Sequence, residues 1–389
     1  MNEILNKSIS EMAGLSFECS CGRRHTVGIK KIVIGSNVME DIADTAREFA
    51  GKKIFFMADS NTYEVYGKKV EQRLLSEDFK LKSFVFKTAH PLIPDEKALG
   101  RLLIEMEEDT SLIITVGSGT LNDLARMLSC KTKVPYVIVA TAPSMDGYAS
   151  VVSPLIVDKF KITFDGVYPY AIIGDIDVIK EAPMHMLYAG FGDILGKLTA
   201  LSDWDLAVGL FNEYYCETST IIVKQALKKC IDNIDGIAAR DADAVRFVME
   251  GLVLSGIAIG LVGNSRPASG AEHHIAHYWE IDAISKDQEH ALHGNCVGVG
   301  TVIIAMVFEM MKGKLPFNVE APSTEYVTGL LTRLGAAKSP AELGITKEVF
   351  KQSVLKAKDV RPRFSVLHVV NDKGLLPEFA EVLTRRFYD

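Results

Sequence analysis

Five of the nine histidines fall between residues 273 and 293, and this cluster could hold a metal ion. In a helix, His273 and His277 share one face, whereas His274 points about 100° away. Upstream, Asp193 follows a glycine in a largely apolar stretch, where a carboxylate is costly to bury unless something pairs it. One carboxylate and two imidazoles with an open position describe a catalytic divalent-metal site. The alternative is a set of solvated surface histidines and an aspartate that caps a helix.

A glycine turn is the second feature with recognisable chemistry. Gly117 and Gly119 follow the apolar run 112–116 and precede a helical pattern over 121–128. Glycines at a strand-to-helix turn let backbone N–H groups approach a pyrophosphate at the positive end of the helix. Asn122 occupies the place of the third glycine of the full dinucleotide fingerprint, so a tight turn without a ligand is an equal alternative.

Small hydroxyl residues and a carboxylate follow the next apolar run, within residues 140–150. Open α/β sheets bind ligands beyond the carboxyl ends of their strands, which makes this segment a candidate binding loop. Asp59 ends another apolar run and could accept hydrogen bonds from ribose hydroxyls. A carboxylate there would disfavour the 2′-phosphate of NADP, which weakly favours NAD. A turn or helix-capping role for Asp59 is equally consistent with the sequence.

These residues need a scaffold, and the apolar pattern predicts two halves that meet near residue 182. In the first half, β-branched runs alternate with helical-looking stretches, which predicts a doubly wound α/β domain with a buried parallel sheet. The expected strands are 32–34, 54–57, 84–86, 112–116, 136–139 and 171–173. The second half shows helical spacing only, over 193–205, 217–231, 242–261, 271–284, 298–311 and 324–334. We therefore expect a dinucleotide-binding domain over 1–182 and an all-helical, metal- and substrate-binding domain over 183–389.

The first 27 residues read as an appendage, with a hairpin expected around Cys19-Ser20-Cys21-Gly22. Cys19, Cys21 and His25 have the spacing of half a zinc knuckle. No second pair of ligands lies nearby in the sequence, so a surface hairpin is the favoured interpretation. Six scattered cysteines do not form a disulfide framework, and a reduced, cytoplasmic protein is the default.

Composition excludes several classes of function. The 389 residues carry a net charge of −7 without a basic run, so nothing favours nucleic acid or an anionic membrane as partner. The opening segment Met1–Lys7 lacks the apolar core of a signal peptide. The longest uncharged apolar runs, 251–263 and 296–308, fall short of the roughly 20 residues that a bilayer requires. We expect both runs to be buried core helices and no insertion into a membrane.

Several segments, taken together and in order, resemble the sn-glycerol-1-phosphate dehydrogenases. This family is a branch of the superfamily that holds iron-containing alcohol dehydrogenases, glycerol dehydrogenase and 3-dehydroquinate synthase. The matching segments are Gly117–Asp123, Thr141–Ser150, Gly192–Lys197, Ser265–His277, His293-Gly294 and Arg361-Pro362-Arg363-Phe364. The resemblance implies a dehydroquinate synthase-like fold, with a Rossmann-like N-terminal domain, an all-helical C-terminal domain and an active cleft between them.

The resemblance also implies roles for individual residues. Asp193, His273 and His293 would be the metal ligands, and Asp146 and His277 would lie at the substrate. Together with Asp59, the residues expected at the nicotinamide dinucleotide are Gly117, Gly119, Thr120, Leu121, Asn122, Asp123, Thr141, Ala142, Pro143, Ser144 and Ser150.

Three details of the ligand segments affect these assignments. A helix shifted by one residue would exchange His273 with His274. His293 precedes Gly294, so we expect its imidazole at the start of a helix. Many relatives carry a glutamate where Asn295 stands, so this chain lacks one carboxylate expected near the metal.

Two basic residues favour a phosphorylated substrate. Lys197 stands where iron-containing alcohol dehydrogenases carry a further histidine ligand, and Arg266 stands seven residues before His273, as an arginine does in dehydroquinate synthases. We hypothesise that Arg266 and Lys197 grip the substrate phosphate. The alternative for Arg266 is an ion pair that ties its loop to a helix.

The implied reaction is the reversible reduction of dihydroxyacetone phosphate to sn-glycerol 1-phosphate by NADH or NADPH. Zinc, nickel or iron would act as a Lewis acid. His277 is the candidate for proton delivery because imidazole titrates near neutral pH, and Asp146 would bind a substrate hydroxyl. A glycerol dehydrogenase and a dehydroquinate synthase-type lyase are the alternatives. We further expect a homo-oligomer.

Overall fold

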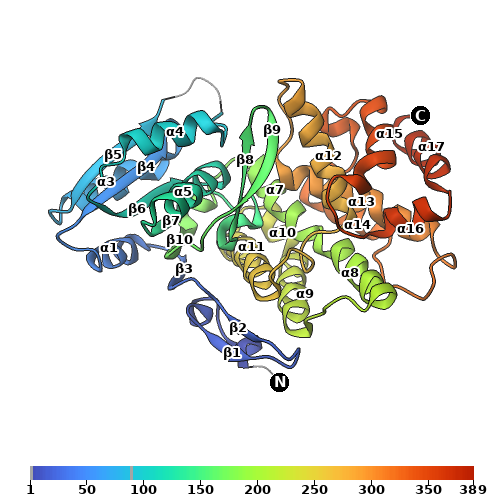
Figure 1. Cartoon of the computed structure of the whole chain (residues 1–389), viewed down its shortest axis with the longest axis horizontal. Helices are drawn as coiled ribbons and strands as arrows, with labels where there is room; N and C mark the ends of the chain where they lie inside the picture. Colours follow the sequence, from blue (N-terminus) through green and yellow to red (C-terminus); the bar gives the residue numbers. More distant parts are fainter. Residues whose placement is uncertain (1–2, 88–90) are drawn as a thin grey trace.

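The first half of the fold is organised around a six-stranded parallel sheet, seen at the left of Figure 1. A computed structural model describes residues 3–87 and 91–389. The sheet has the order β3-β10-β7-β6-β4-β5, and every neighbouring pair in it is parallel. Its strands are β3 (Lys31–Gly35), β4 (Lys53–Asp59), β5 (Lys80–Phe86), β6 (Thr110–Gly117), β7 (Tyr136–Ala140) and β10 (Ala171–Asp175). All six predicted strands are confirmed.

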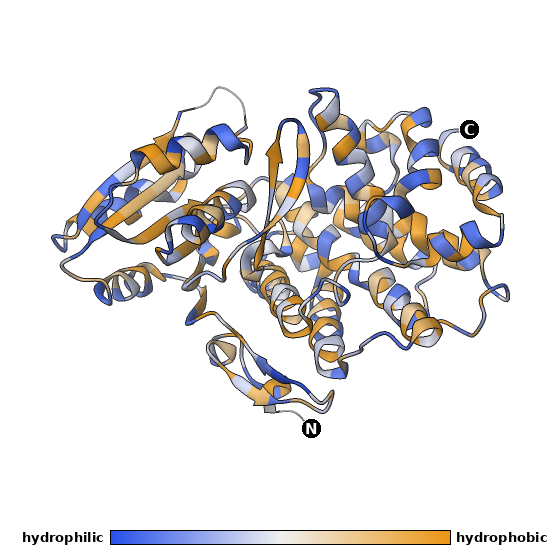
Figure 2. Cartoon of the chain, viewed as in Figure 1, coloured by the Kyte–Doolittle hydropathy of each residue, from blue (hydrophilic) through white to orange (hydrophobic). Residues whose placement is uncertain are grey.

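Helices cover both faces of this sheet, which is why its central strands are apolar without alternation. Phe56 packs with the helices of one face and Phe55 with those of the other, because successive side chains of a strand point to opposite sides. One face carries α1 (Met39–Arg47) and α3 (Lys68–Leu75), and the other carries α4 (Glu96–Glu105) and α5 (Gly119–Thr132). Figure 2 shows the resulting apolar sheet between helices with hydrophilic outer faces. Short elements complete this half: α2 (Ser60–Thr62), the π-helical turn η3 (Tyr63–Gly67), η4 (Asp146–Ala149) and α6 (Ile176–Ile179).

The second half is helical, and none of its described residues belongs to a strand. Its helices are α7 (Met184–Leu195), α8 (Lys197–Phe211), α9 (Glu217–Asp232), α10 (Ile234–Ala238), α11 (Ala242–Val262), α12 (Ala271–Ser285), α13 (His293–Met310), α14 (Thr324–Leu334), η5 (Ala341–Leu343), α15 (Lys347–Lys356), η6 (Ala357–Asp359), α16 (Val366–Asp372) and α17 (Leu376–Tyr388). The helix predicted over 193–205 is divided at Gly196, where α7 ends and α8 begins. The helices after residue 346 were not predicted, and α13 begins at His293 as expected.

Two apolar helices are long enough to cross a membrane by composition. In α11 and α13 the apolar windows are 67% and 72% buried inside the protein. That burial is typical of core helices, as predicted for the runs 251–263 and 296–308. Figure 1 shows both helices within the helical half.

A long antiparallel hairpin between the two halves was not predicted. Its strands are β8 (Val152–Val157) and β9 (Phe160–Asp165), and they contact α5 on one side and α12 on the other (Figure 1). The turn has Asp158 and Lys159 at positive φ, 49° and 65°. The hairpin therefore lies between α5, which follows the glycine turn, and α12, which carries His273 and His277.

The N-terminal appendage is a separate small unit beside α9 (Figure 1). It contains η1 (Glu3–Asn6), η2 (Ser10–Met12) and the two-stranded hairpin β1 (Ser16–Glu18) and β2 (Arg24–Thr26). The hairpin predicted around Cys19–Gly22 is confirmed. Met1 and Asn2, which belong to the opening segment considered above, lie outside the described residues.

Candidate active site

A single cleft of about 930 Å³ brings the two halves of the fold together. Its walls come from the glycine turn before α5, the loop after β7, the hairpin β8–β9, and helices α7, α12 and α13. Of the predicted site residues, those that line it are Asp59, Gly119, Thr120, Leu121, Asp123, Thr141, Ala142, Ser144, Asp146, Ser150, His273, His277 and His293. Gly117, Asn122, Pro143, Asp193, Lys197 and Arg266 are outside this lining.

Three side chains from three helices form a candidate metal site, the triad of Asp193, His273 and His293. One ligand atom from each lies within 4.8 Å of the others, and Asp193 Oδ1 lies 3.5 Å from His273 Nε2. Asp193 is fully buried at the end of α7, directly behind the cleft wall. One carboxylate and two imidazoles converging in this way could hold a divalent metal ion.

Two buried glutamates orient the imidazoles. His273 Nδ1 donates to Glu272 Oε1 at 2.7 Å, and His293 Nδ1 donates to Glu280 Oε1 at 2.7 Å. A ring that donates through Nδ1 keeps Nε2 as the atom available to a metal. Glu280 therefore places a carboxylate beside His293. Glu280 stands seven residues after His273 on the same helical face, a signal that the sequence contained.

Close glycine contacts set the position of Asp193. A Cβ at Gly192 would lie 2.2 Å from the carbonyl oxygen of Gly294, and a Cβ at Gly294 would lie 1.8 Å from that of Ala189. Only hydrogen atoms fit at these points, so α7 and α13 touch backbone to backbone. This contact places the end of α7, with Asp193, beside the start of α13, with His293.

A buried lysine joins the triad to the loop after β7. Lys197 Nζ lies 2.8 Å from Asp193 Oδ1 and 2.8 Å from Asp146 Oδ2, and Ser255 Oγ donates to the same Asp146 oxygen. Burial alone would raise the pKa of Asp193, but Lys197 and the histidines hold it well below its usual range. Burial alone would lower the pKa of Lys197, but the two carboxylates raise it. Lys197 thus pairs with two carboxylates, and its role in gripping a phosphate stays a prediction.

His277 lies on the cleft wall and shares Glu280 with His293. Its Nδ1 donates to Glu280 Oε2 at 3.0 Å, and its ring stacks on that of His293 with centroids 5.0 Å apart. Burial and then the positive charge of Arg361 lower the pKa of His277 well below its ordinary value. The imidazole is therefore neutral at pH 7, which contradicts the expectation that it titrates near neutrality.

His274 faces away from the triad. It is fully buried, and neither ring nitrogen has a hydrogen-bond partner among the described residues. Burial lowers its pKa to about 3, so the ring is neutral. The structure thus brings His273, and not His274, to Asp193 and His293.

Arg266 does not reach the cleft. Its Nε and Nη2 donate to the two carboxylate oxygens of Glu213 at 2.7 and 2.6 Å, and its Nη1 donates to the carbonyl oxygen of Phe364 at 2.7 Å. The side chain is 5% exposed. Each of its three side-chain nitrogens therefore donates inside the protein, and the prediction that Arg266 grips a phosphate stays untested. The alternative of a structural ion pair holds, with a glutamate in place of an aspartate.

Two other cations line the cleft, and the sequence reasoning missed both. Lys161, on β9, pairs with Glu280 Oε2 at 2.6 Å. Arg361 follows η6, and its guanidinium makes no hydrogen bond or ion pair with any described side chain. Burial lowers the pKa of Arg361, and only the charge of Glu280 opposes this. Arg361 is thus a half-buried cation facing the cleft without a paired anion.

The glycine turn before α5 leaves room for a ligand to come close to the backbone at the start of this helix. Gly119 is the first residue of the helix and lines the cleft, while a Cβ at Gly117 would meet the Leu121 side chain at 2.3 Å. Asn122 is buried and donates to the carbonyl oxygen of Gly147, so it holds the neighbouring loop in place.

Asp59 caps α2 by accepting from the Thr62 N–H at 2.8 Å, and it also lines the cleft. The capping interpretation of Asp59 is confirmed, and its contact with a ribose stays a prediction.

The loop after β7 is pressed against α7, which yields a stability prediction. A Cβ at Gly190 would lie 1.7 Å from the carbonyl oxygen of Pro143, so we expect Gly190→Ala to force the two apart. Overpacking of this kind costs about 1–3 kcal/mol or more of the free energy of unfolding. It should also raise KM for NADH, because the displaced loop carries cleft residues Thr141 and Ser144.

Gly100 offers the matched control. It lies within α4, and a Cβ there would have nothing within 4 Å, so Gly100→Ala should stabilise the protein by about 0.5–1 kcal/mol. Urea unfolding and NADH titration measure both variants. Equal stability of the two would show that the contact between α7 and the loop is not tight.

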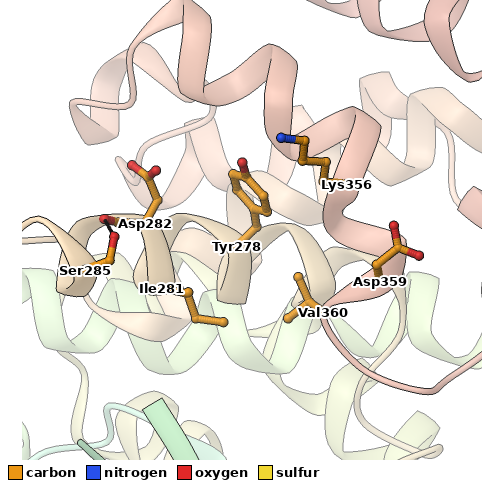
Figure 3. Close-up of a pocket in the computed structure, with 7 residues that line it drawn as sticks. All are labelled: Tyr278, Ile281, Asp282, Ser285, Lys356, Asp359 and Val360. Atoms are coloured by element: carbon orange, nitrogen blue, oxygen red, sulfur yellow. Dashed lines mark hydrogen bonds between the residues drawn. The ribbon is translucent and has the colours of Figure 1, made fainter. Parts of the chain in front are cut away.

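A second hollow of about 320 Å³ lies on another face of α12 (Figure 3). It is lined by Tyr278, Ile281, Asp282, Ser285, Lys356, Asp359 and Val360. Asp282 is paired with Lys286, and no group of metal-donor side chains is found there among the described residues. We therefore assign the active site to the larger cleft.

Comparison with known proteins identifies the family. The profile of the iron-containing alcohol dehydrogenases matches residues 33–183. Glycerol-1-phosphate dehydrogenase [NAD(P)+] of Halalkalibacterium halodurans is 32% identical over 95% of this chain and 99% of its own length. The enzyme of the same name from Geobacillus thermodenitrificans is 32% identical over 96% of this chain and 100% of its own. Among solved structures, glycerol dehydrogenase from Schizosaccharomyces pombe superposes with a TM-score of 0.67 at 20% identity, covering 91% of this chain and 90% of its own.

The structural match confirms the expected fold, with its parallel-sheet domain and helical domain. The two sequence matches span nearly the whole of each chain and confirm the resemblance seen in the motifs. The chain belongs to the glycerol-1-phosphate dehydrogenase family.

Proposed function

We propose that this enzyme catalyses the reversible reduction of dihydroxyacetone phosphate to sn-glycerol 1-phosphate with NADH or NADPH. The observation that carries the proposal is one cleft lined by the glycine turn, by His273 and His293 and by an unpaired arginine, with the third metal donor, Asp193, within reach of the two histidines. The names of the full-length relatives agree with this reaction.

The donor chemistry of the triad suits a divalent metal. Asp193, His273 and His293 would hold the ion, and zinc, nickel and iron are all compatible with one carboxylate and two imidazoles. Glu272 and Glu280 keep the two imidazoles in the tautomer that a metal requires. When bound, the metal supplies Lewis acidity to a carbonyl group, and the nicotinamide supplies or accepts hydride.

The coenzyme would lie along the α/β side of the cleft. The N–H groups at the start of α5 and the positive end of that helix suit a pyrophosphate. Asp59, at the end of β4, would accept hydrogen bonds from a ribose. The hydroxyl groups of Thr141, Ser144 and Ser150, which also line the cleft, would complete the contacts with the coenzyme.

The substrate would lie between the triad and Arg361. The guanidinium offers a bidentate fork to a phosphate, whose negative charge would compensate the unpaired cation. Asp146, fixed by Lys197 and Ser255, would accept a hydrogen bond from a substrate hydroxyl. Neutral His277, held through Nδ1 by Glu280, would take the hydroxyl proton at Nε2 in the oxidative direction and return it in the reductive one.

The test compares three ketone or aldehyde substrates in one assay. Metal-reconstituted protein is mixed with NADH, and loss of the reduced-nicotinamide absorbance is followed with dihydroxyacetone phosphate, dihydroxyacetone and glyceraldehyde 3-phosphate. We expect the highest kcat/KM with dihydroxyacetone phosphate and a product that chiral analysis identifies as the 1-phosphate. A preference for dihydroxyacetone would indicate a glycerol dehydrogenase instead, and metal analysis of the active protein identifies the ion.

Two expectations from the sequence remain predictions. A homo-oligomer is tested by sedimentation equilibrium of the purified protein. A cytoplasmic location is tested by fractionation of the source cells.

A further inference from the structure

A second cluster of metal-donor side chains lies outside the cleft. The cysteine cluster consists of Cys19, Cys21, His25 and Cys216, and one donor atom of each lies within 4.8 Å of all the others. Cys19, His25 and Cys216 are buried, and Cys21 is half-buried. None of the four lines the cleft, so the catalytic chemistry leaves this cluster unexplained.

Local structure explains why three of the donors share one point. Phe17 pairs with His25 across β1 and β2, and the hairpin turn is closed by the Cys19 N–H, which donates to the carbonyl oxygen of Arg23. Gly22 has a φ of 82°, which a residue with a Cβ rarely adopts, and it allows the chain to reverse there. The hairpin thus presents the side chains of Cys19, Cys21 and His25 to the same neighbour.

The fourth donor comes from a distant part of the sequence. Cys216 precedes α9, 197 residues after Cys19, and it is fully buried. The incomplete zinc knuckle of the sequence therefore gains its missing ligand from the helical half. This pairing was invisible in the sequence, because only folding brings the hairpin against α9.

Two donor distances match those around a tetrahedral zinc ion, and a third is shorter. Zinc bonds of about 2.3 Å to sulfur and about 2.0–2.1 Å to nitrogen place two sulfurs about 3.8 Å apart and a sulfur about 3.6 Å from a nitrogen. Cys19 Sγ and Cys216 Sγ are 3.9 Å apart. His25 Nε2 lies 3.6 Å from Cys216 Sγ and 3.2 Å from Cys21 Sγ. The four donors are thus close enough to share one ion after a small adjustment of the Cys21–His25 contact.

The surroundings suit a negatively charged metal–thiolate centre. Three thiolates and a neutral imidazole around Zn²⁺ have a net charge of about −1. Tyr214 Oη donates to Cys21 Sγ at 3.1 Å, and Thr218 Oγ1 lies 3.2 Å from Cys19 Sγ. The Arg23 guanidinium lies 3.4 Å from the centre of the Tyr214 ring, so a positive charge stands nearby. Hydroxyl donors and a cation both stabilise thiolate ligands.

We propose that the cysteine cluster binds a structural zinc ion, which holds the N-terminal hairpin against the helical half. Binding requires each of the three thiols to lose its proton, so it releases up to about three protons per zinc. Four protein ligands leave no open position, which makes the site structural and not catalytic. This inference does not depend on the substrate proposed above.

The cysteine cluster is also linked to the cleft wall through neighbouring residues. Cys216 and Glu213 belong to the short connection between α8 and α9, and Glu213 holds Arg266 through two hydrogen bonds. The loop that carries Arg266 contributes Ser265 and Ser269 to the cleft wall. Zinc bound to Cys216 would therefore fix the end of the α8–α9 connection that precedes α9.

Cobalt substitution tests the proposal on the full-length protein. Metal-free protein is titrated with Co²⁺ under reducing, anaerobic conditions while absorbance is recorded. We expect about one equivalent of thiolate-to-cobalt charge-transfer absorption, with intense visible bands of tetrahedral geometry. The triad, made of carboxylate and imidazole, cannot give a thiolate signal. The readout therefore separates this site from the catalytic centre.

Three variants locate the signal. Cys216→Ser should abolish the charge-transfer band, whereas Cys130→Ser, outside the cluster, should leave it unchanged. His25→Cys should retain a tetrahedral site with a stronger thiolate band. Since Cys216→Ser could fail to fold, Cys130→Ser protein is also titrated with a mercurial, which should release about one zinc as the thiols of the cysteine cluster react.

Three outcomes would overturn the proposal. The first is folded wild-type protein without the charge-transfer band. The second is a Cys216→Ser variant that retains it. The third is a Cys19–Cys216 disulfide found by mass spectrometry in protein from reducing cells.

Discussion

Replacing His273 by alanine should lower kcat/KM for dihydroxyacetone phosphate by about 10³-fold or more, equivalent to about 4 kcal/mol of transition-state stabilisation. His273 contributes one of the three donors of the triad and is held in place by Glu272. Removal of one imidazole leaves Asp193 and His293 as the remaining donors, which weakens metal binding. Metal content and NADH oxidation are measured on the same preparation.

His274 gives the matched control for this prediction. It is adjacent, equally buried and without a hydrogen-bond partner among the described residues, so His274→Leu removes only unpaired polar atoms of a similar volume. The variant should keep its metal and its activity and should not be less stable. The reverse result, with metal lost in His274→Leu and kept in His273→Ala, would mean that α12 is rotated by one residue.

Strands and helices were predictable from the sequence where the local hydrophobic pattern determines them. Continuous β-branched runs gave all six parallel strands, because a sheet covered on both faces selects such runs. The hairpin β8–β9 was missed although Asp158-Lys159 mark its turn, since the sequence places it between two strands of the main sheet. The division of the predicted helix at Gly196 depends on how closely α7 approaches α13, and that is a tertiary property.

Parts of the candidate site were predictable for similar reasons. The helical spacing of His273 and His277 indicated a shared face, and the same spacing extended to Glu280 could have revealed the residue that orients both His277 and His293. The ion pairs that Lys197 forms with Asp146 and Arg266 with Glu213 were not predicted, because these carboxylates are distant in the sequence. Asp146 and Glu213 lie on other segments, and pairing across segments leaves no periodic trace in the sequence.

Arg361→Ala is expected to have the second largest effect. The guanidinium faces the cleft without a paired anion, so a substrate phosphate would form charge-assisted hydrogen bonds with it. Loss of one such bond, at about 1.5–3 kcal/mol, should raise KM for dihydroxyacetone phosphate by about 10–100-fold. Turnover of dihydroxyacetone, which lacks the phosphate, should change little.

Arg266→Ala distinguishes this assignment from the one that the sequence suggested. Arg266 is paired with Glu213, which is 30% exposed, so its loss should lower the free energy of unfolding by about 2 kcal/mol. KM for dihydroxyacetone phosphate should stay within about twofold of the wild type, because Arg266 does not line the cleft. Steady-state kinetics and urea unfolding of both variants measure the two effects separately. If Arg266→Ala raised KM while Arg361→Ala did not, the phosphate would lie on the side of the cleft near α8, and the Glu213 pair would have to open for substrate to bind.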